Sequence, residues 1–364
     1  MSDLQRSPTA PLRCTYLSSE AFDQKRHLFA KNMFGAVCFM RPDDAEPRSL
    51  MAQKESAPLV QIAMPYYNGD AQPTSLCEIW HGDGPITHGV NDVVHYSCND
   101  ELLFGVIQID EAPSASVASE SLARTPLEQA SKLAYAALFE TTDKLGYSSI
   151  LRVWNYIPDI NVESFGIERY KQFNNGRHEG FLSRGRAVKG SVPAASAVGV
   201  CTGPLTICFF ASRQIVPVPI ENPRQVSAYL YPTQYGATSP TFSRANVVPL
   251  GGEKILFISG TASIVGHETL HAGDLLAQAH ETLANISIIL DEANRIVPSL
   301  SVGIADLCCK VYVREAAHIA ALDAALRAVL GSAIRLIYLQ ADICRAGLLM
   351  EIEATAGHPV EFAV

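Results

Sequence analysis

The sequence lacks the cysteine spacing that marks zinc sites and disulfide frameworks. It contains nine cysteines, an odd number, and no two of them form a C-x-x-C pair. This usage predicts reduced thiols in a cytoplasmic protein. Three histidines recur at intervals of seven residues, but the glycines and the proline between them exclude one continuous helix: they are His81, His88 and His95. We therefore predict no metal site.

Long hydrophobic runs and phosphate-binding loops are missing as well. The N-terminal segment MSDLQRSPTAPLR has no apolar run after its charges, so it does not resemble a signal peptide. The longest apolar stretches, such as residues 207–211, have the length of a strand and cannot span a bilayer. The pair Gly251–Gly252 is not followed by a G-x-G-x-x-G, GKS or GKT motif, so it predicts a turn and not a phosphate site.

Positive charge is scarce relative to negative charge. The chain has 28 Lys and Arg against 37 Asp and Glu, a net charge of -9. This balance argues against nucleic acid or an anionic membrane as the main partner. A small anionic ligand stays compatible with it, because a few local arginines can outweigh the overall field. The 364 residues, 48% of them hydrophobic, predict a packed globular protein with room for two domains.

The hydrophobic patterning predicts an α/β protein. We expect strands at residues 59–64, 102–109, 150–157, 254–259, 306–314 and 348–354, and helices at 126–145, 274–293 and 316–330. Two of the helix-then-strand units look alike, since each has Gln-Ala near the helix start and an apolar strand that ends with a basic residue. We interpret them as an internal duplication, although any α/β protein can produce such a pair by chance.

The last predicted strand alternates, with two glutamates on one face. Met350 and Ile352 point to one side, and Glu351 and Glu353 point to the other. From the residues alone, Glu351 is more typical of an exposed strand position than of a functional one. Cys344, seven residues earlier, is by itself more typical of a buried structural thiol.

The second half of the chain, roughly residues 245–360, resembles the YjgF/RidA superfamily. The stretches that carry the resemblance are FISGTAS, NISIIL, KVYVRE and MEIEATA. In that superfamily the first glutamate of the terminal EIEA stretch lies in the ligand cleft, and here this position is Glu351.

From about residue 59 to its end, the chain resembles the chorismatase family more specifically. The long stretches that match are ILRVWNYIPDIN, ERYKQFNNGR, ENPRQVSAYLYPTQYG, SPTFSRA and LQADICR followed by LLMEIE. The resemblance implies two YjgF/RidA-like units, which are chorismate-mutase-like mixed sheets with helices packed on one face. We expect an N-terminal extension and loop at 1–58, an N-terminal domain at 59–220 and a C-terminal catalytic domain at 221–364. Because the superfamily often forms trimers, we expect a monomer or a homotrimer.

The same resemblance implies the cofactor-free conversion of chorismate to pyruvate and a hydroxybenzoate. Benzoate-forming members are expected to carry a cysteine seven residues before the catalytic glutamate and a glycine in the ISG stretch. Cys344 and Gly260 occupy these positions, which favours 3-hydroxybenzoate and leaves 4-hydroxybenzoate open as a second product. Two alternatives remain. One is a hydrolytic chorismatase that forms 3,4-dihydroxycyclohexa-1,5-dienoate and pyruvate, and the other is a non-catalytic YjgF-like metabolite-binding module.

The implied chemistry assigns roles to individual residues. Cleaving the enolpyruvyl ether needs a proton on the enol methylene, so Glu351 is expected to be a general acid that burial keeps protonated. Cys344 is expected to assist the step that forms the aromatic ring. The two substrate carboxylates need forked cationic donors and hydroxyl donors. The candidates for substrate binding are Arg177, Arg244, Arg314, Tyr170, Tyr231 and Tyr235, together with Gly260.

Overall fold

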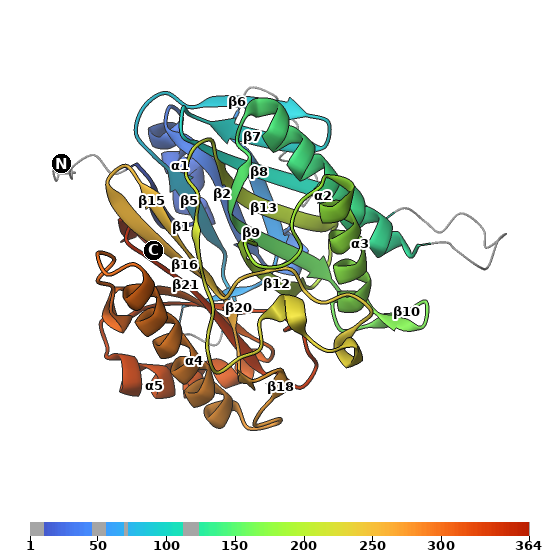
Figure 1. Ribbon diagram of the computed structural model, residues 1–364. Helices are drawn as coiled ribbons and strands as arrows, with labels where there is room; N and C mark the ends of the chain where they lie inside the picture. Colours follow the sequence, from blue (N-terminus) through green and yellow to red (C-terminus); the bar gives the residue numbers. More distant parts are fainter. Residues whose placement is uncertain (1–10, 46–55, 69–71, 112–123, 364) are drawn as a thin grey trace.

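A computed structural model of the protein describes residues 11–45, 56–68, 72–111 and 124–363. Three mixed β-sheets share one apolar core, and helices cover their outer faces (Figure 1). The shared core takes residues from all three sheets, among them Trp80, Trp154 and Phe257. Three further clusters fill the spaces between each sheet and its own helices. None of the helices that the structure describes is long and apolar enough to cross a membrane.

The first predicted unit forms a six-stranded sheet with the order β12-β9-β13-β8-β7-β6. Its strands are β6 (Thr87–Asn91), β7 (Val94–Cys98), β8 (Leu102–Ile109), β9 (Ser149–Pro158), β12 (Ala194–Val200) and β13 (Leu205–Ser212). Helices α2 (Pro126–Leu145) and α3 (Arg169–Ser183) pack on its outer face. The predicted bounds of α2 are confirmed, because Thr125 and Glu128 form a capping box and Gly146 ends the helix in a left-handed conformation.

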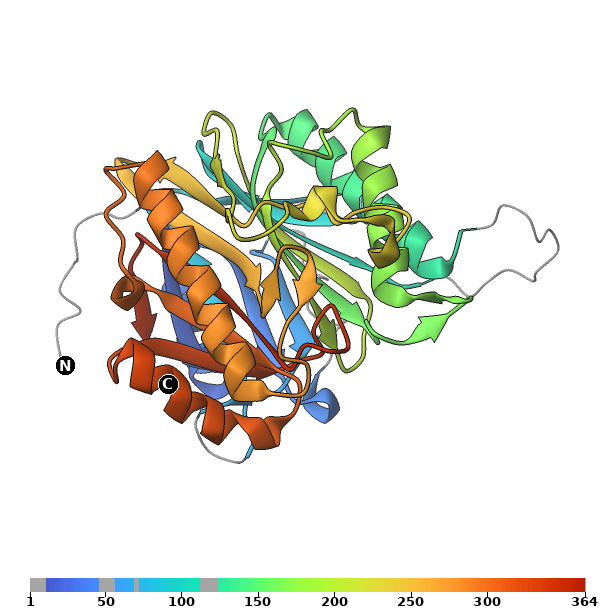
Figure 2. The same cartoon turned by 60° about the horizontal axis from the view of Figure 1, so that its bottom comes forward.

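The second predicted unit forms a seven-stranded sheet with the order β14-β15-β16-β21-β19-β20-β4. Its strands are β4 (Tyr66–Tyr67), β14 (Val218–Ile220), β15 (Ala245–Leu250), β16 (Glu253–Thr261), β19 (Cys308–Val313), β20 (Arg335–Gln340) and β21 (Met350–Ala356). Its helices are α4 (Leu275–Ile296) and α5 (Ile319–Leu330), which cover the outer face of the sheet in Figure 2.

The two units have the same topology, so the predicted duplication is present in the fold. In each unit a helix leads into a strand that pairs in parallel with the next one, β9 with β12 and β19 with β20. In each unit the last strand lies antiparallel between the strand that follows the helix and an earlier strand. β13 lies between β9 and β8, and β21 lies between β19 and β16. The strands of the two units correspond one to one. The order β12-β9-β13-β8-β7-β6 in the first unit matches β20-β19-β21-β16-β15-β14 in the second.

A third, smaller sheet has the order β22-β1-β5-β2-β3. It consists of β1 (Arg13–Ser18), β2 (Met33–Met40), β3 (Leu59–Ala63), β5 (Leu76–His81) and β22 (Val360–Phe362), with α1 (Ser19–Phe29) outside it. Its pairing repeats that of the other two, since β2 runs parallel to β3 and β5 lies antiparallel between β1 and β2. The single chain therefore surrounds its central core with three sheets of related topology.

This third sheet differs from the predicted N-terminal extension at 1–58. Residues 13–40 form β1, α1 and β2, because both strands bury nearly every side chain between α1 and the shared core. Residues 1–10 and 46–55 of the predicted extension lie outside the described residues. The sheets also exchange short strands, since β4 joins the C-terminal sheet and β22 joins the N-terminal one. The domain bounds at 59–220 and 221–364 stay a prediction.

Cys38 and Cys77 form a disulfide, whereas the sequence predicts reduced thiols. The two residues lie opposite each other in the β2–β5 pair, and the remaining seven cysteines are free. They are 39 residues apart and belong to no spacing motif, so only the strand register brings them together.

Candidate active site

A pocket of about 330 Å³ lies between the two repeated units. The first unit contributes residues at the start of α3, such as Tyr170. The second unit contributes β16, β21, the segment before β15 and the loop between β20 and β21. Two short 3-10 helices, Ala228–Leu230 and Thr233–Tyr235, precede β15 and carry Tyr231 and Tyr235 at the pocket. Seven of the nine predicted site residues line it: Tyr170, Tyr231, Tyr235, Arg244, Gly260, Cys344 and Glu351.

Glu351 is the second residue of β21, and its carboxyl lies at the pocket. The neighbouring Met350 and Ile352 point to the other face of the strand, where they pack in the core beneath α4 and α5. The face that holds Glu351 is turned towards the first unit instead of solvent, and Glu351 is only 4% exposed. Burial, and after it the negative charge of Glu353, raise the pKa of Glu351 to about 8. The carboxyl therefore holds a proton near neutral pH.

Gly260 on β16 forms the wall against which the Glu351 carboxyl rests. A Cβ atom at this position would stand 2.7 Å from Cδ of Glu351 and still nearer its Oε1. The Gly260 N–H donates a hydrogen bond to Oγ of Ser196 at 3.0 Å, which holds the backbone in place. A glycine is therefore needed here for space.

We expect Gly260→Ala to lower kcat for the reaction proposed below by about 10²-fold, the size of effect that misplacing a reacting group can produce. The added methyl group must push the carboxyl out of its position, because Ser196 holds the Gly260 N–H and the flanking Ile258 and Thr261 pair with β21. Steady-state kinetics and a thermal melt of the same preparation check this. The control is Gly303→Ala, an exposed glycine with negative φ where an added Cβ atom would meet only Asp306, at 3.6 Å. A Gly260→Ala enzyme with wild-type kcat would contradict the close packing.

Cys344 lies in the loop between β20 and β21 and also borders the pocket. Burial, and after it the negative charge of Glu351, raise the pKa of this thiol to about 12. At neutral pH the side chain is thus a thiol that can donate a proton. Tyr170, whose pKa is also raised by burial, likewise keeps its hydroxyl proton.

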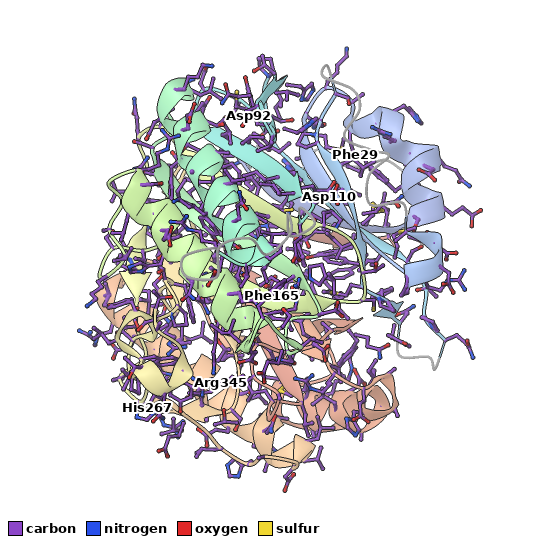
Figure 3. The ribbon with its side chains drawn as sticks, turned by 90° about the vertical axis from the view of Figure 1, so that its right-hand side faces the viewer. Phe29, Asp92, Asp110, Phe165, His267 and Arg345 are labelled. Carbon is purple, nitrogen blue, oxygen red and sulfur yellow. A yellow bond between two sulfur atoms is a disulfide. The ribbon has the colours of Figure 1, made fainter. Side chains whose placement is uncertain are left out.

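Two arginines reach the pocket, and one of them was not predicted. Arg244 is buried, its Nη2 donates to the Val226 carbonyl and to the Tyr231 hydroxyl at 2.9 Å each, and its Nε has no partner. Arg345 donates from Nη1 to the His267 carbonyl at 2.8 Å and lies over the Tyr235 ring at 4.0 Å. Figure 3 shows Arg345 and His267 close together at one side of the molecule. The signals for Arg345 in the sequence are its place at the end of the LQADICR stretch and its position next to Cys344.

The structure does not bring the other two predicted arginines into the pocket lining. Arg177 is buried within α3, where its Nη2 donates to Asn174 at 3.0 Å and its guanidinium lies 5.1 Å from the Phe173 ring centre. Arg314 forms an ion pair with Asp342 and donates from Nε to the Leu348 carbonyl at 3.0 Å. Arg314 thereby ties down both ends of the loop that carries Cys344, and its donors are already occupied.

Other lining residues were not singled out from the sequence. They are Glu168, Lys171, Gln234, Pro240, Phe242, Ala262, Ile264 and Ala346. Several of them belong to the stretches that resemble the chorismatases, but no residue type or spacing marks them individually. In the described part of the chain, no group of three or more His, Cys, Asp or Glu side chains is arranged to hold a metal ion.

Comparison with known proteins matches residues 78–211 to the family model described as chorismatase FkbO/Hyg5-like, N-terminal. A 3-hydroxybenzoate synthase of Streptomyces hygroscopicus is 36% identical over 288 residues, which is 76% of this chain and 80% of that protein. A chorismatase of Streptomyces rapamycinicus is 35% identical over 285 residues, covering 77% of this chain and 81% of the relative. A crystal structure of a chorismatase superposes with a TM-score of 0.81 at 29% identity, over 96% of this chain and 99% of the other.

Proposed function

Since this chain belongs to the chorismatase family, we propose that it converts chorismate to 3-hydroxybenzoate and pyruvate without a cofactor, with Glu351 as the general acid. The observation that carries the proposal is a buried carboxyl, with its pKa raised to about 8, beside two arginines in one pocket. A protonated carboxyl next to fixed positive charge suits an anionic substrate that must be protonated on carbon.

The polar groups of the pocket correspond to the polar groups of chorismate. Chorismate has two carboxylates, and the pocket has two arginines, Arg244 and Arg345. We assign the unpaired Nε of the buried Arg244 to one carboxylate and the more exposed Arg345 to the other. Tyr231 lies beside both guanidinium groups and Tyr235 lies beside that of Arg345, so the two tyrosines add hydroxyl donors and keep the arginines in place.

The first step is transfer of the Glu351 proton to the methylene carbon of the enolpyruvyl group. The ether carbon becomes an oxocarbenium centre, and the ether oxygen becomes a good leaving group. The oxygen of the neighbouring ring hydroxyl then bonds to the ring carbon that carries the ether. The old carbon–oxygen bond breaks, and the departing group is pyruvate in its keto form. The hydroxyl proton returns to Glu351, so the acid is regenerated.

The second step opens the resulting epoxide to an aromatic ring. The carbon–oxygen bond at the former hydroxyl carbon breaks, the oxygen gains a proton, and the ring carbon that keeps the oxygen loses its hydrogen as a proton. The product is 3-hydroxybenzoate, and opening the other bond would instead give 4-hydroxybenzoate. Because hydroxybenzoate and pyruvate together contain all the atoms of chorismate, the reaction consumes neither water nor an oxidant. We assign Cys344 to the opening step as proton donor, which its retained thiol proton supports.

We expect Cys344→Ala to shift the product from 3-hydroxybenzoate towards the dihydroxydiene acid. Without the donor the epoxide opens to the aromatic product more slowly, so water can add to the epoxide and form the diol instead. Product separation by chromatography with ultraviolet detection measures the ratio of the two acids. Cys201→Ala, which removes an exposed free thiol, is the matched control and should leave the ratio unchanged. An unchanged product ratio in Cys344→Ala would remove Cys344 from the mechanism.

The alternative of a hydrolytic chorismatase differs only in the fate of the activated ether. Incubating the pure protein with chorismate, with no added metal or nucleotide, distinguishes the alternatives. Release of pyruvate, detected with lactate dehydrogenase, separates an enzyme from a binding module. An aromatic product then supports the synthase and a diene product supports the hydrolase. Cytoplasmic localisation and a monomer or homotrimer stay predictions.

A further inference from the structure

Four charged side chains lie together in the shared core, outside the pocket. Glu78 of β5, Arg152 of β9, Lys310 of β19 and Glu353 of β21 come from all three sheets, and each is at most 6% exposed. Taking four charges out of water is unfavourable unless they pair well, and apolar residues often replace such clusters without loss of stability. Stability alone therefore does not explain the cluster.

The cluster is paired and its charges cancel. Glu353 accepts from Arg152 Nη2 at 2.8 Å, from Lys310 Nζ at 2.8 Å and from Trp154 Nε1 at 2.9 Å. Lys310 also donates to Glu78 at 2.7 Å. Burial alone would raise the pKa of Glu353, but Lys310 and Arg152 outweigh it and lower the pKa to about 2. Two anions thus face two cations, and Glu353 is the anion that contacts both cations.

The cluster extends to the wall of the pocket. Arg152 Nη2 donates to Ser196 Oγ at 2.6 Å, and the same oxygen accepts the Gly260 N–H at 3.0 Å. Gly260 in turn packs against the Glu351 carboxyl. Glu353 and Glu351 are alternate residues of β21, so they share one face of the strand.

The surroundings of Glu351 contain charged and titratable groups from several elements. These groups are Glu353 on its own strand, Arg152 on β9, Tyr312 on β19, Tyr170 on α3, Cys344 in the β20–β21 loop and Arg244 before β15. Arg152 and Arg244 are the cations among them, and both favour the ionised form of Glu351. No described residue donates a hydrogen bond to the Glu351 carboxyl.

We propose that Glu353 is a positioning residue whose carboxylate neutralises Arg152 and Lys310, so that Glu351 keeps its proton until substrate binds. The inference rests on the proposed role of Glu351 as general acid. Glu353 has two effects, and both favour the protonated form of Glu351. It forms an ion pair with Arg152, the cation with the largest effect on Glu351, and its own negative charge disfavours a second charge on the same strand face.

We expect Glu353→Gln to shift the high-pH limb of the kcat profile to lower pH by at least about one pH unit, which is a tenfold loss of activity on that limb. The variant leaves two cations against one anion, so Glu351 ionises at lower pH. Activity near pH 5.5 should approach that of the wild type. Pyruvate release from chorismate, measured across the pH range, gives the profile. Glu361→Gln, an exposed carboxyl on β22, is the control and should leave the limb in place.

The double variant Arg152→Met/Glu353→Gln separates charge from structure. It removes one cation with the anion and leaves the Lys310–Glu78 pair, so the limb should return towards its wild-type position. A purely structural role for Glu353 would lower activity at every pH and leave the limb unmoved in both variants. That outcome would overturn the inference.

If Glu353→Gln does not fold, Glu78→Gln leaves the same excess of positive charge farther from the pocket. It should move the limb in the same direction by a smaller amount, and an unmoved limb there would also count against the inference. Glu351→Gln distinguishes a failure of the proposed function from a failure of the role of Glu353. If Glu351→Gln keeps its activity, the proposed function fails. If it is inactive while the Glu353→Gln limb stays unmoved, only the role of Glu353 fails.

Discussion

Replacing Glu351 by Gln is expected to lower kcat for pyruvate release from chorismate by about 10³-fold, within the usual contribution of a general acid. The glutamine has nearly the same shape, but it has no acidic proton to place on the enol methylene. Substrate affinity should change little, because the arginines and tyrosines of the pocket are untouched. Initial rates with a coupled pyruvate assay, together with chorismate binding by calorimetry, measure both quantities.

The same variant should be more stable than the wild type at neutral and alkaline pH. The pKa of Glu351 is about 8 in the folded protein, against an ordinary value of 4.5. Between these values the unfolded chain releases a proton that the folded chain keeps, so the free energy of unfolding falls as the pH rises. Because glutamine has no proton to release, the variant does not lose this stability as the pH rises. The melting temperature of Glu351→Gln should therefore exceed that of the wild type at pH 8 and approach it at pH 4.5.

Glu253→Gln, which changes an exposed carboxyl on β16, is the control for both measurements. It should behave as the wild type in rate and in melting temperature. A Glu351→Gln enzyme that retains a tenth of the wild-type kcat would rule out Glu351 as the acid. In that case the raised pKa would have to be explained by burial without a catalytic role.

Arg244→Lys is expected to lower kcat/KM for chorismate by about 10²-fold, chiefly through KM, because lysine cannot form the paired bonds of a guanidinium group. Arg244 is buried, two of its bonds from Nη2 hold Val226 and Tyr231, and its Nε has no acceptor until a ligand provides one. Lysine keeps the charge but loses the fork. Steady-state kinetics over a range of chorismate concentrations measure the effect.

Tyr231→Phe tests whether this loss comes from binding or from local structure. It removes the bond between Arg244 and Tyr231 but leaves the guanidinium group at the pocket. We expect a smaller rise in KM than for Arg244→Lys. If Arg244→Lys has a wild-type KM, Arg244 does not bind a carboxylate, and Arg345 must serve as the main cation.

Residues that look alike in the sequence diverge in the structure. Arg177 and Arg244 lie in stretches that resemble the chorismatases, and Arg314 lies in KVYVRE, which resembles the YjgF/RidA superfamily, yet only Arg244 lines the pocket. The donors of Arg314 are taken by Asp342 and by backbone carbonyls, and these acceptors come from a loop that approaches it only in the folded chain. Which donors remain free for a ligand depends on tertiary neighbours, so sequence patterns cannot rank the arginines.

Local sequence by itself determined α2, α4, α5, several of the strands and the repeat, but it did not predict α1, α3 or strands such as β2 and β12. Capping residues and apolar spacing act within a few residues of the chain, as the bounds of α2 show. The resemblance to a family then identified Glu351 and Cys344. Only the tertiary structure decided what lies opposite the polar face of β21. Alternation along a strand shows that Glu351 and Glu353 share a face, but it cannot show whether that face meets water or another sheet. Here it meets β9 and the shared core, so one glutamate is ion-paired and the other is left with its proton.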